Sequence, residues 1–267
     1  MVRYKMFCRK STLYCATCPN GIKIRERLNF YLTAVLKCGI IVKLIYLADK
    51  CLGRTDKMIK IERISVMNFE NAMRGARNPL NSWARMDSYY DEDGNFVLGD
   101  NDLTLAERLA KAGSDHRKFL RQIIVSLDIT APLYWWKEFD TYKVGTVANS
   151  CSTMHKIQAK EFTRADFSCE RMSEDTLAVL DSVIECLEKN RLAFIETKEK
   201  GYWHNMIQLL PTSYNQLRTV TLNYEVLINI YNSRRHHKLA EWRILCDEIK
   251  KLPYAKELIQ MREIDDE

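Results

Sequence analysis

The sequence predicts an α+β domain in which helices predominate. Three short runs of apolar, β-prone residues indicate strands, at residues 59–66, 123–129 and 217–222. Around them, apolar residues recur at helical spacing, most clearly after Ser173 and over residues 224–234. With 46% hydrophobic and 28% charged residues, a chain of 267 residues is long enough to bury a core of this kind.

The first 57 residues differ from the rest in charge. They carry twelve Lys or Arg and three acidic residues, a net charge of +9, so the other 210 residues carry −3 of the total of +6. The basic pI of the whole chain therefore says nothing about nucleic-acid binding by the main body. We interpret residues 1–57 as a basic N-terminal extension that is not part of the fold or not translated, and residues 58–267 as the domain.

Two patterns in this extension have other interpretations. Cys15 and Cys18 have the spacing of zinc ligands, but the first histidine of the chain is His116, so we expect no zinc site. Residues 30–48 are apolar and long enough to span a bilayer. They contain two lysines, each of which costs about 2.5–3.5 kcal/mol at the membrane centre. A peripheral amphipathic helix is the alternative for this stretch.

Cysteine usage indicates a reducing compartment. Five of the nine cysteines lie in the first 57 residues, the total is odd, and no cleavable signal peptide opens the chain. We therefore expect reduced thiols in a cytoplasmic protein.

The elements before the centre of the chain follow from simple patterns. Apolar residues alternate from residue 59 to 66 as in a strand, residues 69–77 are helix-like, and residues 78–83 suit a turn. Residues 91–100 are acidic and contain glycine, which predicts a loop without the ligand spacing of an EF-hand. Asn101 or Asp102 can cap a helix that continues to residue 110 and stops at Gly113.

The central stretch predicts a buried strand followed by an aromatic helix. The strand at residues 123–129 ends before Pro132, which suits the first turn of a helix. That helix carries Trp135 and Trp136 with two other aromatic residues in about two turns, and we expect them to pack in the core. Residues 144–153 are small or carry hydroxyl groups, which predicts a loop that wraps a ligand.

The C-terminal half is predicted to be mainly helical. Ser173 caps a helix whose apolar face reaches residue 187, and this face indicates core packing. We expect further helices at residues 191–198, just before Leu210, and at residues 224–234, 240–251 and 254–261, with a strand at residues 217–222.

Two blocks resemble the flavin-dependent thymidylate synthase (ThyX) family. Residues 128–156 resemble its central motif, in which a strand, an Ala-Pro pair and a helix lead into an Arg-His-Arg triplet and a loop of Ser, Asn, Ser and Arg. Residues 209–244 are similar to its Leu-Pro, Thr-Val-Asn, Asn-Phe-Leu, Arg and Gln-Trp-Glu-Ile series. The resemblance implies a single ThyX-like domain with a central, mostly antiparallel sheet, assembled as a homotetramer with active sites at subunit interfaces.

The resemblance also implies a reaction. In this family dUMP is reductively methylated to dTMP, with FAD as cofactor, methylenetetrahydrofolate as carbon donor and NADPH as reductant. Such a site needs phosphate-binding cations and a platform for the flavin, but no cysteine nucleophile and no metal. Neither a nucleic acid nor a membrane is expected as a partner.

Individual residues take their expected roles from the two blocks. The resemblance implies catalytic roles for Arg234 and His116, cofactor binding by Thr141, Tyr142, Lys143, Asn223 and Asn229, and substrate binding by Glu138, Asn149, Cys151, Ser152, Thr153 and Arg234. From the residues alone, His116 fits a solvated turn equally well, and Cys151 suits a small buried thiol better than a nucleophile. The adjacent His236 and His237, beside Lys238, could grip a phosphate, but they point different ways on a helix and so predict no metal pair.

The chain departs from the family pattern at its cations. Thr141, Tyr142 and Lys143 stand at the Arg-His-Arg triplet, and Thr153 stands at the closing arginine of the loop. Threonine does not replace a bidentate arginine. As point charges, Lys137, Lys143, Lys156 or Arg235 could substitute.

These departures motivate an alternative, a ThyX-fold protein without this activity that acts as a flavin or nucleotide-binding module or on another pyrimidine nucleotide. A third hypothesis is a membrane-associated or nucleic-acid-binding protein that uses the basic segment 1–57. It predicts that deletion of this segment abolishes localisation or binding.

Overall fold

The computed structural model describes residues 6–9, 12–15 and 59–260. The chain divides into two units, Met1–Lys57 and Met58–Glu267. In the first unit, β1 (Met6–Arg9) pairs antiparallel with β2 (Thr12–Cys15). Cys18, the apolar stretch 30–48 and residues 261–267 lie outside the described residues. What was expected of them, and of the extension as a whole, stays a prediction.

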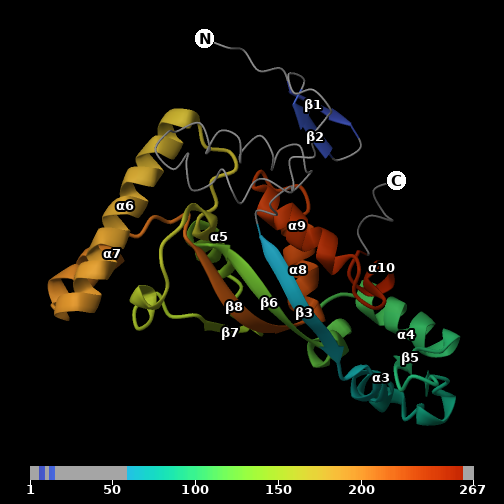
Figure 1. The fold of residues 1–267 in the computed structure, drawn as a ribbon. Coiled ribbons are helices and arrows are strands. Elements are labelled where there is room, and N and C mark those ends of the chain that lie inside the picture. Colours follow the sequence, from blue (N-terminus) through green and yellow to red (C-terminus); the bar gives the residue numbers. More distant parts are fainter. Residues whose placement is uncertain (1–5, 10–11, 16–58, 261–267) are drawn as a thin grey trace. The chain divides into compact units, whose positions relative to one another are not determined.

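The second unit is built on a four-stranded antiparallel sheet (Figure 1). Its strands lie in the order β3 (Lys60–Met67), β6 (Ile124–Pro132), β8 (Asn215–Asn223) and β7 (Val147–Ser150). Val125 pairs with Leu222 and Leu127 with Val220, so the buried side chains of the two central strands share one face. The predicted α+β class and antiparallel sheet are confirmed.

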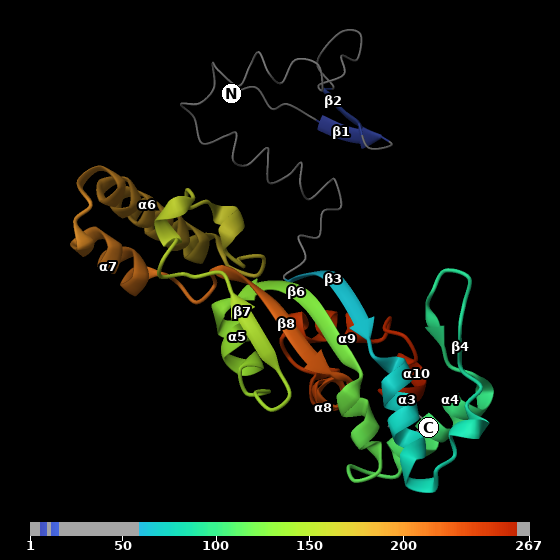
Figure 2. The same cartoon turned by 90° about the horizontal axis from the view of Figure 1, so that it is seen from below.

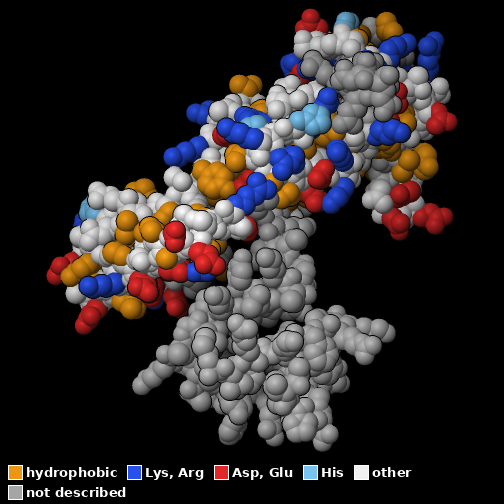
Figure 3. Space-filling model, turned by 90° about the horizontal axis from the view of Figure 1, so that it is seen from above, with side chains coloured by type: hydrophobic (Ala, Val, Ile, Leu, Met, Phe, Trp, Pro, Cys, Tyr) orange, Lys and Arg blue, Asp and Glu red, His pale blue; other side chains and the backbone are white. Residues whose placement is uncertain are grey.

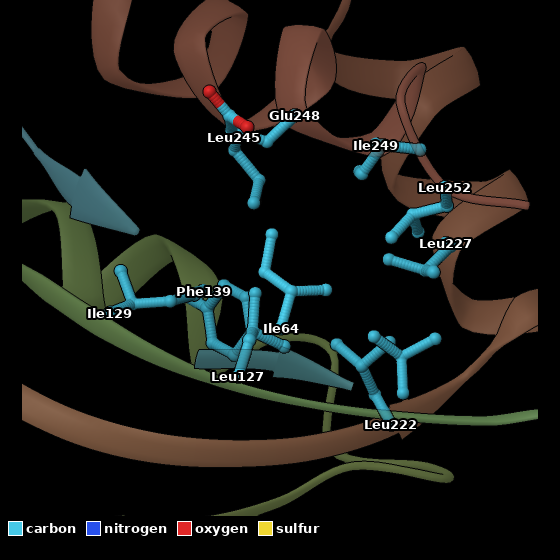
Figure 4. Close-up of a pocket in the computed structure, with 11 residues that line it drawn as sticks. Ile64, Leu127, Ile129, Phe139, Leu222, Leu227, Leu245, Glu248, Ile249 and Leu252 are labelled. Atoms are coloured by element: carbon cyan, nitrogen blue, oxygen red, sulfur yellow. The ribbon is translucent and has the colours of Figure 1, made fainter. Parts of the chain in front are cut away.

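Three helices cover this apolar face: α5 (Leu133–Phe139), α8 (Tyr224–Arg234) and α9 (Ala240–Ile249). Trp135 and Trp136 of α5 are both fully buried, which confirms the expected core packing. Figure 4 shows a cavity between the sheet and the helices α8 and α9, lined by side chains of the strands, of Phe139 and of these helices. The cavity measures about 10 Å³, so it is a small packing gap and no place for a cofactor.

One end of the sheet carries a second group of helices, made of α3 (Phe69–Arg77), α4 (Asp100–Lys111), α10 (Ala255–Leu258) and the 3₁₀ segment η4 (Arg117–Gln122) (Figure 2). The short 3₁₀ segments Asn78–Leu80 and Trp83–Arg85 and a hairpin of β4 (Tyr89–Tyr90) and β5 (Phe96–Val97) join α3 to α4. Arg77 and Asp102 form a buried ion pair at 2.6 Å that ties α3 to α4. Asp102 also accepts the hydroxyl of Ser88 at 2.5 Å.

The other end of the unit is an arm of two helices, α6 (Glu174–Thr197) and α7 (Lys200–Leu209) (Figure 1). It packs over the 3₁₀ segments η5 (Ile157–Ala159) and η6 (Arg164–Asp166) and has a hydrophobic cluster of its own. The buried members of this cluster are Ile157, Phe162, Phe167, Leu180, Leu187 and Met206.

Several predicted elements differ from the structure. The helices expected at 173–187 and 191–198 are one helix, α6, because Glu188, Lys189 and Asn190 continue it without a breaker. Ser173 caps this helix as predicted, accepting the backbone N–H of Thr176 at 3.3 Å. The helix α4 was expected to be capped by Asn101 or Asp102, but it begins at Asp100 after Gly99. The carboxylate of Asp102 binds Arg77 and does not cap the helix.

The remaining differences lie at loops and helix ends. Within the expected ligand-wrapping loop 144–153, residues 147–150 form the edge strand β7, because β8 offers its free edge to them. Within the expected loop 91–100, Phe96 and Val97 pair with β4. The last helix begins after Tyr254, which adopts φ 54, and it is shorter than predicted. Among the described residues, no helix is long and apolar enough to cross a membrane.

The two buried indoles of α5 give a test of this core. Nε1 of Trp136 donates to the backbone oxygen of Gln216 at 3.0 Å, whereas Nε1 of Trp135 has no hydrogen-bond partner among the described residues. Trp136→Phe and Trp135→Phe remove similar buried area, but only the first removes a side-chain hydrogen bond to the backbone of β8. We expect Trp136→Phe to be less stable than Trp135→Phe by about 1 kcal/mol in urea unfolding. Equal losses for the two variants would contradict this account.

Candidate functional site

The candidate site lies where three helix ends meet. Pro132 is extended, at φ −68° and ψ 150°, and α5 begins at the next residue, which puts Glu138 on the last turn of α5. The helix α8 ends at Arg234, and α9 begins at Ala240 after a short connection. The last turn of α5, the end of α8 and the first turn of α9 therefore supply the side chains of one cluster.

Glu138 is the centre of this cluster. Its Oε2 accepts Nε1 of Trp242 at 2.7 Å and Nη1 of Arg234 at 3.2 Å. Nε2 of His237 lies 3.7 Å from the same oxygen. The carboxylate therefore joins α5 to both α8 and α9 through hydrogen bonds that include a charged donor.

Arg234 is held on several sides. Its Nε donates to the hydroxyl of Tyr142 at 3.0 Å. Its guanidinium lies 4.6 Å from the ring centre of Trp242 and 5.7 Å from that of Tyr142. Its side chain is 19% exposed. A guanidinium has five N–H donors, so this arginine keeps donors beyond those that Glu138 and Tyr142 engage.

A second chain of contacts ties α5 to the residues after β7. Arg218 of β8 lies 4.3 Å from the ring centre of Trp136 and pairs with Asp140 at 2.8 Å. Its Nε donates to the side-chain oxygen of Gln216 at 3.0 Å. Nε2 of Gln216 in turn donates to the backbone oxygen of Cys151 at 2.7 Å. These contacts fix the position of Cys151 relative to the end of α5.

The segment between α5 and β7 follows α8 from its end to its start. Tyr142 contacts Arg234 at one end, and Gly145 lies against Asn223 and Val226 at the other. Gly145 has φ +77, and a Cβ there would lie 2.9 Å from the side-chain nitrogen of Asn223, so the position requires glycine. Oδ1 of Asn223 caps α8 by accepting the backbone N–H of Val226 at 3.1 Å.

The predicted residues do not all meet in one place. Asn223 and Arg234 lie at opposite ends of α8, roughly 16 Å apart along the helix axis. His116 precedes η4 and is exposed. It adjoins the start of α8, because Arg117 and Arg121 of η4 both pair with Glu225. Hydrogen bonds from the two arginines, Arg121 first, lower the pKa of Glu225.

The other predicted residues are at the surface or in turns. Thr141 and Lys143 are exposed, and the hydroxyl of Thr141 donates to the backbone oxygen of Glu138 at 2.7 Å. Asn229 is exposed on α8, and Asn149 is exposed on β7 opposite Thr219.

In the loop after β7, the predicted burial of one residue, Cys151, is wrong. Oγ of Ser152 accepts the backbone N–H groups of Met154 and His155, and Thr153 is half-buried. Nε1 of Trp203 donates to the backbone oxygen of Met154 at 2.8 Å, which holds this loop against α7. Cys151 is exposed, so the expectation of a small buried thiol is wrong. Because β7 is an edge strand, no described strand packs beside its end, or beside the residue that follows it, on the side away from β8.

The contacts of two members of the cluster with Glu138 were not predicted. Trp242 and His237 contact Glu138, although more than 95 positions separate them from it in the sequence. The only sequence signal was the similarity of residues 209–244 to one family block, and it gave no pairing with α5. His236 is exposed and lies beside Arg235, with Nε of the arginine 3.2 Å from Nε2 of the histidine.

Charge is unevenly spread around this region. Arg234, Arg235 and Lys238 follow one another closely, and Arg243 comes soon after them in α9. On the face seen in Figure 3, Lys and Arg side chains gather over the middle of the molecule, whereas Asp and Glu side chains are frequent at the α6–α7 end. An anionic ligand is therefore favoured at the middle of this face.

The residues around Tyr142 suit an anionic ligand with aromatic rings, such as FAD. Tyr142 offers a half-buried ring, and the adjacent Lys143 offers an exposed cation. Asn223 is engaged in capping and would act by holding Gly145 in place. Groups of three or more metal-ligating side chains are absent from the described part of the chain.

No family model and no curated protein matches the sequence. Two solved structures of the flavin-dependent thymidylate synthase ThyX from Helicobacter pylori, both with FAD and dUMP, are similar to it. Each is 17% identical with a TM-score of 0.54; they cover 74% and 75% of this chain and 98% and 96% of their own. The chain therefore has the fold of the flavin-dependent thymidylate synthases. The UMP/dUMP methylase PolB from Streptomyces cacaoi, bound with 5-Br dUMP, is 13% identical over 76% of this chain and 94% of its own, with a TM-score of 0.49.

The exposure of the cysteines is directly testable. Cys151 is exposed, whereas Cys246 is buried and burial raises the pKa of its thiol to about 12. Because the thiolate is the reactive form, brief treatment with a maleimide at pH 8 should modify Cys151 and leave Cys246 unmodified. Peptide mapping by mass spectrometry resolves the sites, and Cys186, also exposed, serves as the positive control. Early modification of Cys246 would contradict the burial of this thiol in α9.

Proposed function

We propose that this chain is a flavin-dependent thymidylate synthase, which binds FAD and dUMP and forms dTMP with methylenetetrahydrofolate and NADPH. The observation that carries the proposal is the meeting of Glu138, Tyr142 and Arg234 in one cluster. They come from the two separate blocks that resemble this family, and they meet in a fold shared with a synthase solved with FAD and dUMP.

In this proposal the residues of the chain bind and orient, while the cofactor supplies the redox chemistry. When bound, reduced FAD supplies the hydride. Arg234 offers its remaining N–H donors to the anionic substrate, and Glu138 with Trp242 holds its guanidinium in a fixed orientation. Lys143 contributes a point charge where the family has an arginine, and Tyr142 and Asn229 face the flavin.

Within a single chain, the residues predicted for the site do not all lie close to one another. His116 adjoins the start of α8, whereas Arg234 is at its end. We therefore propose that the site is completed by other subunits of a homotetramer, with Asn149 supplying an exposed amide and Ser152 and Thr153 supplying half-buried hydroxyl groups. A cytoplasmic location with reduced thiols fits the same proposal.

The proposal predicts a yellow protein whose NADPH oxidation depends on dUMP. Arg234→Ala should lower the dUMP-dependent rate by about a hundredfold, because a fixed cationic donor is lost. Arg108→Ala removes the same charge from the exposed surface of α4 and should leave the rate unchanged. The absorbance spectrum and the NADPH rate with and without dUMP are the measurements. A colourless protein that takes up no added FAD would refute the proposal.

A second candidate function has an observation of its own. Arg234 is already neutralised by Glu138, and Thr141-Tyr142-Lys143 lacks the paired cations of the family. A protein that keeps the fold and acts as a nucleotide-binding module, or on another pyrimidine nucleotide, would retain this cluster for stability alone.

Glu138→Gln separates the two candidates. It removes the negative charge but keeps an oxygen that can accept Nε1 of Trp242. The hydrogen bond from the hydroxyl of Thr141 to the backbone oxygen of residue 138 stays in place. If Arg234 binds the substrate, dUMP should bind about threefold to fivefold more tightly, since a competing charge worth up to about 1 kcal/mol is gone. If the cluster is structural, the variant should unfold at lower temperature with no change in dUMP affinity. Calorimetric titration and thermal unfolding of the same samples give both readings.

A further inference from the structure

A cleft of about 410 Å³ lies at the first turn of α5, at the opposite end of this helix from Glu138, and shares no residue with the Arg234 cluster. It opens between the first turn of α5, residues 168–172, residues 211–213 and the first turn of α9. Its size lies in the lower part of the range that holds small organic ligands.

The cleft contains a buried carboxylate. Glu241 is 3% exposed, and its Oε1 accepts the hydroxyl of Tyr134. Among residues 59–260, no Lys, Arg or His forms an ion pair with it. A buried carboxylate is costly unless charged or N–H donors approach it, so this one has accepting capacity left for a ligand.

The partner of Glu241 stays a donor over the whole physiological range. Burial first, and the hydrogen bond to Glu241 second, raise the pKa of Tyr134 well above its usual value. The phenol therefore keeps its proton, and it turns that proton toward Oε1. The remaining lone pairs of the carboxylate are those that a ligand in the cleft can use.

The cleft has an apolar wall and hydroxyl groups, and its two exposed charged side chains, Glu170 and Arg171, have opposite signs. The ring of Tyr134, with Met172 and Pro211, forms an apolar side, and the side chains of Thr212 and Ser213 offer hydroxyl groups. A planar group with two N–H donors matches a carboxylate better than a point charge does. We propose that this cleft is a second small-molecule site, which takes a ligand bearing an amidinium or guanidinium group that donates to Glu241.

Benzamidine is the probe, because it joins a flat ring to an amidinium, and benzamide is its uncharged counterpart. Calorimetric titration of the full chain should show binding of benzamidine and about tenfold weaker binding of benzamide. Glu241→Gln should weaken benzamidine binding by about tenfold. Glu170→Gln, at an exposed position on the cleft mouth, is the matched control and should change the affinity less than about twofold.

Two further variants keep the test decisive if Glu241→Gln does not fold. Tyr134→Phe frees Oε1 and should bind benzamidine at least as tightly as the wild type. Thr212→Trp, at an exposed wall position, should fill the cleft and abolish binding. Equal affinity for benzamidine and benzamide, or no effect of the Thr212 variant, would overturn the proposal. Arg234→Ala should leave benzamidine binding intact, so failure here is distinct from failure of the proposed synthase activity.

Discussion

The burial of three indoles between the sheet and α9 is the constraint on which the rest of this unit depends. The ring of Trp135 lies 4.7 Å from that of Trp242, and Trp136 is anchored to the backbone of β8. An aromatic helix of only seven residues, α5, cannot shift along the sheet without breaking these contacts. It therefore presents Tyr134 at its first turn and Glu138 at its last turn in a fixed way.

This fixed orientation explains why two carboxylates close to α5 have different surroundings. Glu138 meets a guanidinium, an imidazole and an indole, so its charge is balanced within the protein. Glu241, on α9, has a hydrogen bond from only one described side chain, the phenol of Tyr134. The neighbouring Trp242 contacts Glu138, so adjacent residues of α9 contact the first and the last turn of α5.

The sequence was most informative where local signals agree with the fold. The helices α3 and α8 have the predicted bounds, and in the structure Asn223 caps α8 at its predicted start. The strand β7 was not predicted, since Val147–Ser150 has little strand character and is ordered by the free edge of β8. For the same reason the exposure of Cys151 could not be predicted, because it follows from the edge position alone.

In the candidate site too, the sequence predicted some of the residues but not the tertiary contacts between them. Similarity to a family selected Glu138, Tyr142 and Arg234, and the structure brings these three together. Their pairing with Trp242 and His237 depends on how α9 crosses α5, and that crossing is set by indole packing between residues more than 100 positions apart. No periodicity within a single segment carries that information.

The α6–α7 arm has a consequence for the motions of the molecule. Its cluster of six buried residues is separate from the main core, and the two helices join through Lys198 in a left-handed conformation. A unit with so few buried apolar contacts opens at a lower free energy than the sheet and α5 do. Amide exchange in α6 and α7 therefore reports local opening of the arm, and the loop that Trp203 holds against α7 shares that opening.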